Sequence, residues 1–347
     1  MSETPNDDPD PARRFVFGEV ERRASLTRAE YLEDFAGRRP VLIEGGARET
    51  PAFRRWTPEY VREHAGHAEL ELLAGLYEPE AREAGYPDVR SVTTTVRDVI
   101  ESLLEDDPSR GYVFNNPSSV MRTNSAQPEF DIGWKEGANP GLAALDADFE
   151  LPDFVREQDL IHAFLVLGGA RHRAPLHYDL GGEAKALVGI RGRKRVLLFH
   201  PSEARRLSFP GWFDEPQPFR VPHAAEVNVH RPDFERFPLL EGARCLEAVV
   251  EEGDVLYWPS FWPHDVTNLD RLTLAVGCAF EELGASSMLI RESLGFLGQL
   301  YLAATKGEAQ PSAEVGETFR RLEELVMSEE LGRLRTFYGW HAKLFSS

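Results

Sequence analysis

A series of short strand-like segments between residues 160 and 280 constrains the fold more than any other feature of the sequence. Each segment is rich in apolar residues and is bounded by turn-forming residues such as Gly, Pro, Asn and Asp. The expected strands cover residues 163–167, 175–180, 184–190, 194–199, 246–250, 254–258, 265–268 and 272–280. Short strands at a spacing of roughly 8–12 residues are typical of a sandwich or barrel. No helical pattern separates them, which argues against a parallel βαβ sheet.

The sequence before residue 160 alternates short helices with strands. We expect helices after the capping box at Thr27–Glu30, from Thr57 to Gly66, and from Thr95 onward. Strands are expected at residues 40–44, 69–73 and 111–114. Residues 115–158 are rich in Asn, Pro, Gly and Asp and are expected to be mostly loop.

The two ends of the chain differ from the middle. Residues 1–14 are rich in Asp and Pro and have no apolar run, so we expect a disordered acidic tail and not a secretory signal. Residues 284–347 are expected to be helical, with an apolar stripe that includes Ile290, Leu294 and Leu297. The stripe is wider than one packing face requires, so the helices either fold back on the barrel or pack against a second subunit. We expect a homodimer.

The charge balance restricts the partners. The chain has 39 Lys and Arg against 58 Asp and Glu, a net charge of −19, so we expect no nucleic-acid partner. No apolar run approaches the ~20 residues of a membrane helix, so no membrane partner is expected either. Cys245 and Cys278 lie in apolar stretches and are expected to be buried, reduced thiols. A cytoplasmic location follows as an expectation.

His177-Tyr178-Asp179 is the first candidate for chemistry. Residues i and i+2 of a strand project from one face, so the imidazole and the carboxylate are expected to point the same way. With one more histidine they make a 2-His-1-carboxylate triad, which suits non-haem iron(II) because it leaves open coordination positions. The alternative reading is an ordinary His beside a turn Asp.

His264 is the candidate for the third ligand. It follows the segment Pro259-Ser-Phe-Trp-Pro263, in which two prolines and two aromatic residues restrict the backbone. A restricted backbone is what a preorganised ligand requires. A loop histidine packed on aromatic residues is the alternative.

Lys194 is the candidate partner for an anion. It lies in Gly192-Arg-Lys-Arg195, directly before an apolar strand, and alternation puts Lys194 on the opposite face from Arg193 and Arg195. A lysine that faces into a barrel is costly unless it is paired, so an anion is expected beside it. A solvated basic hairpin is the alternative reading.

These residues lie in longer segments that resemble the cupin-like JmjC family, which includes the asparaginyl hydroxylase that restrains hypoxia-inducible factor. The similar segments are Gly37-Arg-Arg-Pro-Val-Leu-Ile-Glu-Gly45, Arg55-Trp-Thr-Pro-Glu-Tyr60, Pro175-Leu-His-Tyr-Asp179, Gly192-Arg-Lys-Arg195, Leu198-Phe-His-Pro201, Arg231-Pro-Asp-Phe-Glu-Arg-Phe-Pro238 and Glu247-Ala-Val-Val-Glu-Glu-Gly-Asp-Val-Leu-Tyr257. The resemblance covers residues 15–283, which we therefore expect to form the catalytic domain. It implies a mainly β fold with flanking helices, built on a double-stranded β-helix (jelly-roll) core.

The resemblance also implies an activity and a set of site residues. His177, Asp179 and His264 would be the catalytic iron(II) ligands, and Lys194 would pair with the distal carboxylate of the cosubstrate 2-oxoglutarate. Tyr112 occupies a place similar to a tyrosine that helps to bind the same acid. The expected enzyme is a dioxygenase that uses O₂, releases succinate and CO₂, and hydroxylates a side chain of a protein or peptide.

The sequence departs from the family pattern in two places near the site. Ala174 stands where many members have a threonine, so one hydrogen bond to the cosubstrate is expected to be missing. The stretch from Asp179 to Lys194 is about two residues longer than usual, which preserves strand parity and makes Lys185 a second candidate for the carboxylate. Two other functions stay open: a small-metabolite hydroxylase of the same mechanism, and a non-catalytic cupin binding module.

Overall fold

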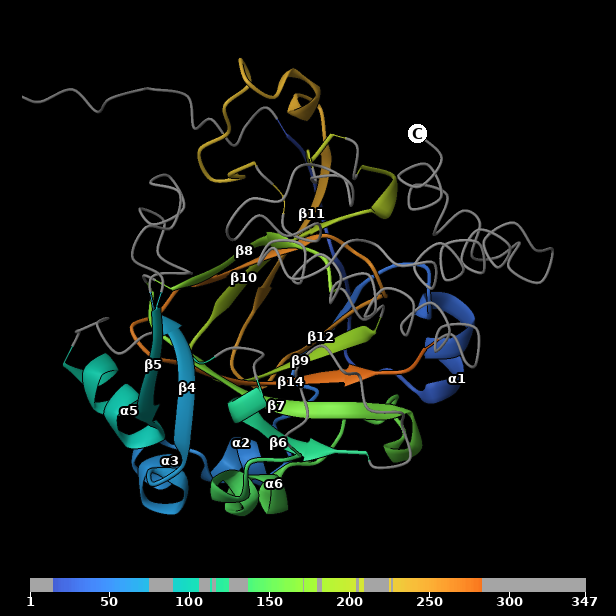
Figure 1. The fold of residues 1–347 in the computed structure, drawn as a ribbon. Helices are drawn as coiled ribbons and strands as arrows, with labels where there is room; N and C mark the ends of the chain where they lie inside the picture. The colour runs from blue at the N-terminus through green and yellow to red at the C-terminus, as the bar shows by residue number, and fades with distance from the viewer. Residues whose placement is uncertain are drawn as a thin grey trace, which may run out of the picture.

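A computed structural model gives the fold of residues 15–74, 90–105, 113, 117–124, 137–170, 172–179, 183–203, 206–208, 225 and 227–282. The expected tail at residues 1–14 and the expected helical segment at residues 284–347 lie outside these residues. The described strands form two main sheets that face each other, with β8, β10 and β11 on one side and β7, β9, β12 and β14 on the other (Figure 1).

The first sheet has five strands in the order β1-β11-β10-β13-β8. They are β1 (Val16–Glu19), β11 (Arg244–Val250), β10 (Lys194–Phe199), β13 (His264–Asn268) and β8 (Arg173–His177). The second has seven strands in the order β2-β3-β12-β9-β14-β7-β6. They are β2 (Glu21–Arg23), β3 (Val41–Ile43), β12 (Val255–Trp258), β9 (Ala184–Arg191), β14 (Thr273–Phe280), β7 (Leu160–Gly168) and β6 (Val120–Thr123).

The path of the chain from β7 to β14 identifies the jelly roll. Strand β7 lies in the second sheet and β8 in the first, and β9 and β10 repeat that change of sheet. After β11 in the first sheet, β12, β13 and β14 lie in the second, first and second sheets in turn. The expected double-stranded β-helix is confirmed, and the described strands from residue 160 to residue 280 match the expected segments within a few residues at their ends.

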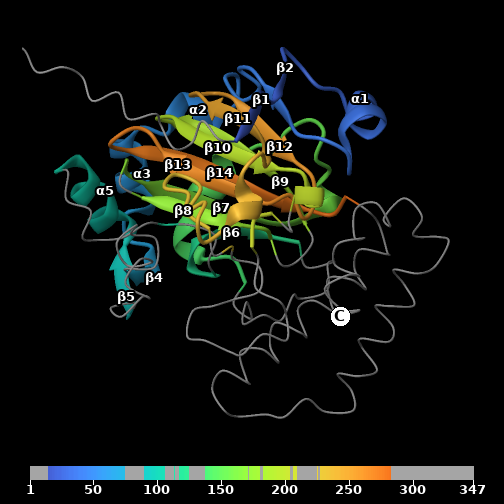
Figure 2. The ribbon, with the colours of Figure 1, turned by 90° about the horizontal axis from the view of Figure 1, so that it is seen from above.

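The N-terminal half supplies α1 (Arg28–Glu30), a π-helical turn (Tyr31–Phe35), α2 (Pro51–Arg55), α3 (Pro58–Ala65), α5 (Val96–Leu104) and α6 (Ala143–Asp148). Helices α2, α3 and α6 lie on the outer side of the seven-stranded sheet (Figure 1). Helices α1 and α5 lie at opposite ends of the molecule (Figures 1 and 2). Short 3₁₀ turns lie at Pro117–Ser119, Pro140–Leu142, Glu157–Asp159, Pro201–Glu203 and Pro238–Leu240. A hairpin of β4 (Glu69–Ala74) and β5 (Arg90–Thr95) forms a separate two-stranded sheet.

The expected helix starts are confirmed. The Thr27 side chain and the Glu30 side chain cap each other's backbone N–H groups, as the capping box predicted. The hydroxyls of Thr57 and Thr95 accept from backbone N–H groups in the first turns of α3 and α5.

Strand alternation in β7 separates the two faces of the large sheet. Leu165 and Leu167 belong to the buried cluster that also contains Val99 and Ile100 of helix α5. Phe164 and Val166 point the other way and line a pocket between the two main sheets. The helices therefore bury one face of the sheet, and the other face is left for a site.

Two local expectations are refined. Within residues 115–158, which were expected to be mostly loop, the described part contains the short elements β6 and α6 as well as 3₁₀ turns. Asn139 uses its turn-forming side chain to start the 3₁₀ turn that leads into α6. Of the strand expected at 111–114, only Val113 is described, and it makes an isolated bridge with Leu167. Cys245 and Cys278 are buried and free, as expected.

Candidate metal centre

Strand register brings the two candidate histidines together. His177 is the last residue of β8 and His264 is the first residue of β13, and the two are directly paired in the antiparallel ladder. Their ring centroids lie 4.3 Å apart. A register shift between His264 and Val266 marks a bulge at this point, and bulges often re-aim side chains next to functional sites.

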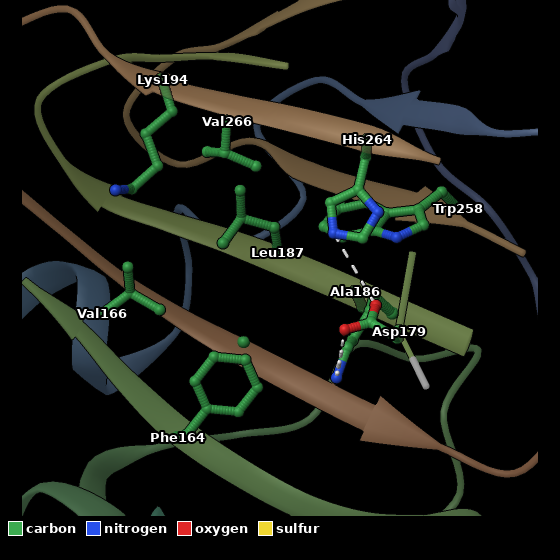
Figure 3. A pocket seen from close by; sticks show the side chains of 11 residues that line it. Phe164, Val166, Asp179, Ala186, Leu187, Lys194, Trp258, His264 and Val266 are labelled. Carbon is green, nitrogen blue, oxygen red and sulfur yellow. Dashed lines mark ion pairs between the residues drawn. The ribbon is translucent and has the colours of Figure 1, made fainter. Parts of the chain in front are cut away.

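Asp179 completes the cluster. One ligand atom from each of His177, Asp179 and His264 can be chosen so that all three lie within 4.8 Å of one another. The Oδ2 atom of Asp179 lies 3.8 Å from the Nε2 atom of His264. The prediction placed Asp179 within a strand. Because β8 ends at His177, Asp179 instead lies just beyond the strand. The carboxylate nevertheless points into the same pocket (Figure 3).

Backbone carbonyls orient both imidazoles. The Nδ1 atom of His177 is 2.8 Å from the carbonyl oxygen of Pro175, and that of His264 is 2.9 Å from the carbonyl oxygen of Trp262. Each Nδ1–H donates to its carbonyl, so the second nitrogen, Nε2, is the atom that can coordinate a metal. Two oriented imidazoles and one carboxylate are a donor set that fits a divalent transition metal.

The turn before His264 is restricted, as its sequence indicated. Phe261 has φ of 61°, an uncommon conformation for a residue with a side chain. The Trp258 ring lies 4.9 Å from the His264 ring, between centroids. The imidazole is thus fixed by the turn, by its carbonyl acceptor and by an aromatic neighbour.

Burial sets the protonation of the ligands. It lowers the pKa of His264 well below its ordinary value, and the neighbouring His177 lowers it further. The imidazole is therefore neutral near pH 7, as a metal ligand must be. Burial raises the pKa of Asp179, and the ammonium of Lys185 opposes that effect.

The pocket extends from this cluster to Lys194. The space between its lining atoms is about 440 Å³, a value that includes solvent at its open side. Figure 3 shows Lys194 at the opposite end from His264 and Asp179, with Val266 and Leu187 between them. The pocket therefore has a polar group at each end and apolar walls in the middle.

Lys194 faces inward, as strand alternation predicted. Only 2% of its surface is exposed, whereas Arg193 pairs with Asp270 at the surface. Its Nζ atom donates to Asn268 Oδ1 at 2.6 Å and to Thr273 Oγ1 at 3.1 Å. Burial lowers the pKa of Lys194 to about 7. Sequence reasoning missed Asn268 and Thr273, which are on other strands and reach Lys194 only through the register of the sheets.

Lys185 and Tyr112 were the other two candidates for binding the cosubstrate. Lys185 also lines the pocket, but its Nζ atom lies 3.6 Å from Asp179 Oδ1, at the metal end. Tyr112 lies outside the described residues. Ala174 is buried in β8, where its methyl group offers no hydrogen bond.

Comparisons with known proteins give the family context. The sequence model of the cupin-like domain matches residues 28–284. The tRNA wybutosine-synthesizing protein 5 of Homo sapiens is 23% identical over 248 residues, which are 71% of this chain and 73% of that protein. The lysine-specific demethylase JMJ21 of Arabidopsis thaliana is 25% identical over 298 residues, 82% of this chain but 26% of that protein. The JmjC domain-containing protein C of Dictyostelium discoideum is 26% identical over 142 residues, 40% of this chain and 32% of that protein.

None of the helices in the described part of the chain is long and apolar enough to cross a membrane.

Proposed function

Because this chain belongs to the cupin-like domain family, we propose that it is an iron(II)- and 2-oxoglutarate-dependent dioxygenase that hydroxylates a protein or peptide side chain. The observation that carries the proposal is a pocket that is lined by Asp179 and His264 at one end and by the buried Lys194 at the other. His177 joins the first two residues in a cluster whose ligand atoms lie within 4.8 Å of one another. A 2-oxo acid with a second carboxylate has complementary groups at the same two ends.

The proposed ion would be held by the Nε2 atoms of His177 and His264 and by the carboxylate of Asp179. Three protein ligands leave coordination positions for a bidentate cosubstrate and for O₂. Bound iron(II) would supply the activation of O₂ that is coupled to decarboxylation of 2-oxoglutarate to succinate and CO₂.

The chain's own groups would bind and shield the cosubstrate. Lys194 would donate to the distal carboxylate, with Asn268 and Thr273 holding the amine in place. Val166, Leu187 and Val266 line the pocket between its ends, and apolar walls exclude water from the reacting atoms. The interaction of a charged donor with a carboxylate is stronger in such a site than it is in water.

The substrate class rests on charge and on the relatives. A net charge of −19 favours a basic peptide or protein over a polyanion. A tRNA nucleoside is the second candidate, because four animal relatives named for tRNA wybutosine synthesis match 70–72% of the chain. A small metabolite remains an alternative with the same mechanism.

The decisive experiment is turnover of purified protein loaded with iron(II) under anaerobic conditions and then given 2-oxoglutarate and O₂. Succinate release, with a gain of one oxygen in peptides from a proteome digest, is expected, and mass spectrometry detects both products. Total tRNA is assayed in parallel by nucleoside analysis. His177→Ala is the matched inactive control. If protein fully loaded with iron(II) releases no more succinate than His177→Ala does, the proposal is refuted.

A further inference from the structure

A second buried lysine lies at the metal end of the pocket. Lys185 in β9 is 3% exposed, and its backbone pairs with Trp258 of β12, whose ring contacts His264. Its Nζ atom lies 2.9 Å from Glu183 Oε1 and 3.6 Å from Asp179 Oδ1. The Phe164 ring covers the ammonium, with the ring centroid 5.3 Å from Nζ. Two carboxylates and an aromatic face therefore fix one cation.

The two oxygens of Asp179 have different surroundings. Oδ1 faces the Lys185 ammonium, and Oδ2 faces His264 Nε2 at 3.8 Å. The carboxylate is thus turned so that one oxygen points toward the ligand cluster and the other is engaged by a charged donor. An unrestrained carboxylate can bind a metal with both oxygens, as mono- and bidentate carboxylates in metal sites show.

We propose that Lys185 is a positioning residue that makes Asp179 a one-oxygen metal ligand. By holding Oδ1, the ammonium prevents chelation by both oxygens and keeps one more coordination position open for the cosubstrate or O₂. This inference rests on the proposed function.

Glu183 and Phe164 explain why Lys185 can do this in a closed pocket. When Asp179 shares its charge with a metal, the ammonium keeps a carboxylate partner in Glu183 and is not left as an unpaired buried charge. Phe164 is held over Gly277, where a Cβ would overlap its ring. If the Lys185–Glu183 pair contributed only stability, the approach of Lys185 to Asp179 Oδ1 would be unnecessary.

Cobalt(II) is the probe for the test, because its visible absorption spectrum reports coordination number and geometry without turnover. Lys185→Met removes the charge at similar length, and Lys194→Met makes the same change at the far end of the pocket. We expect wild type and Lys194→Met to share one spectrum in the absence of cosubstrate. Lys185→Met should bind cobalt(II) at least as tightly as wild type, since a like charge is removed, but with a different spectrum.

Cosubstrate binding gives the second readout. With Asp179 free to chelate, 2-oxoglutarate must displace one of its oxygens. We therefore expect the dissociation constant of 2-oxoglutarate for the cobalt(II)-loaded Lys185→Met protein to rise by about tenfold, which corresponds to about 1.4 kcal/mol for the displaced oxygen. Lys185→Gln, which is too short to hold Oδ1, should reproduce both changes, and it serves as a second variant if Lys185→Met does not fold. A folded Lys185→Met protein with the wild-type spectrum overturns the inference. Wild type that binds no cobalt(II) overturns the proposed function instead.

Discussion

Replacement of Lys194 by Met tests the far end of the pocket. The amine is 2% exposed and donates to Asn268 and Thr273, so Met at nearly the same length removes the charge without a large loss of packing. A hydrogen bond to a charged group contributes about 1.5–3 kcal/mol, and about 1.4 kcal/mol is a tenfold change in a dissociation constant. We therefore expect Lys194→Met to weaken 2-oxoglutarate binding by about 10- to 100-fold.

Calorimetric titration of 2-oxoglutarate into cobalt(II)-loaded protein measures this constant directly. The metal titration itself should be unchanged, because Lys194 lies at the opposite end of the pocket from the ligand cluster (Figure 3). Arg193→Met is the matched control, since Arg193 is the adjacent cation but pairs with Asp270 at the surface. If Lys194→Met binds 2-oxoglutarate as tightly as Arg193→Met does, Lys194 is not the carboxylate partner, and Lys185 becomes the alternative.

Three further outcomes are expected. The double variant His177→Ala, His264→Ala should lose stoichiometric iron(II) while it keeps the wild-type circular dichroism spectrum; retained stoichiometric metal would refute the ligand assignment. Sedimentation should show a homodimer that Leu294→Glu with Leu297→Glu splits, whereas a 39.1 kDa species at tens of micromolar would exclude the dimer. Thr57→Ala removes the cap of α3 and should lower the free energy of unfolding by about 1 kcal/mol in denaturant titrations, with no effect on metal affinity.

The sequence predicted the fold well because its periodicities are local. Strand alternation was enough to place Lys194 inside and Arg193 outside, and Pro and Gly marked most strand ends. The stiff turn before His264 also carried a local signal, which the positive φ of Phe261 confirms.

The rest of the site depends on register, which the sequence does not show. His177 and His264 face each other because β8 and β13 pair in one register, and Asn268 is paired with Lys194 because β10 and β13 do. A slip of one residue would turn each of these side chains to the other face. The residues next to Thr273 in β14 and Phe164 in β7 do not indicate that these side chains contact Lys194 and Lys185. At 115–158 the composition indicated loop, and the turn-forming residues concealed the short strand β6 and the short helix α6 that lie among them.

The two buried lysines of the pocket are expected to differ in charge before cosubstrate binds. Burial acts to lower the pKa of Lys185, but the carboxylates of Asp179 and Glu183 raise it above its ordinary value. Burial lowers the pKa of Lys194 to about 7, and the Asn268 and Thr273 oxygens that accept hydrogen bonds from it carry no charge. At pH 8 the Lys194 amine is therefore mostly neutral in the empty pocket, whereas Lys185 stays charged.

Binding of a carboxylate favours the charged form of Lys194, so cosubstrate binding at pH 8 should take up close to one proton. Because the pKa of Lys194 is lowered to about 7 in the empty pocket, the amine is charged without cosubstrate only below that pH. Affinity for 2-oxoglutarate is therefore highest below pH 7 and falls by up to about tenfold per pH unit above it. Calorimetry in two buffers with different ionisation enthalpies measures the uptake, and Lys194→Met should abolish it. Equal binding enthalpies in both buffers at pH 8 would show that Lys194 is already charged in the empty pocket, which would contradict burial as the dominant influence on its pKa.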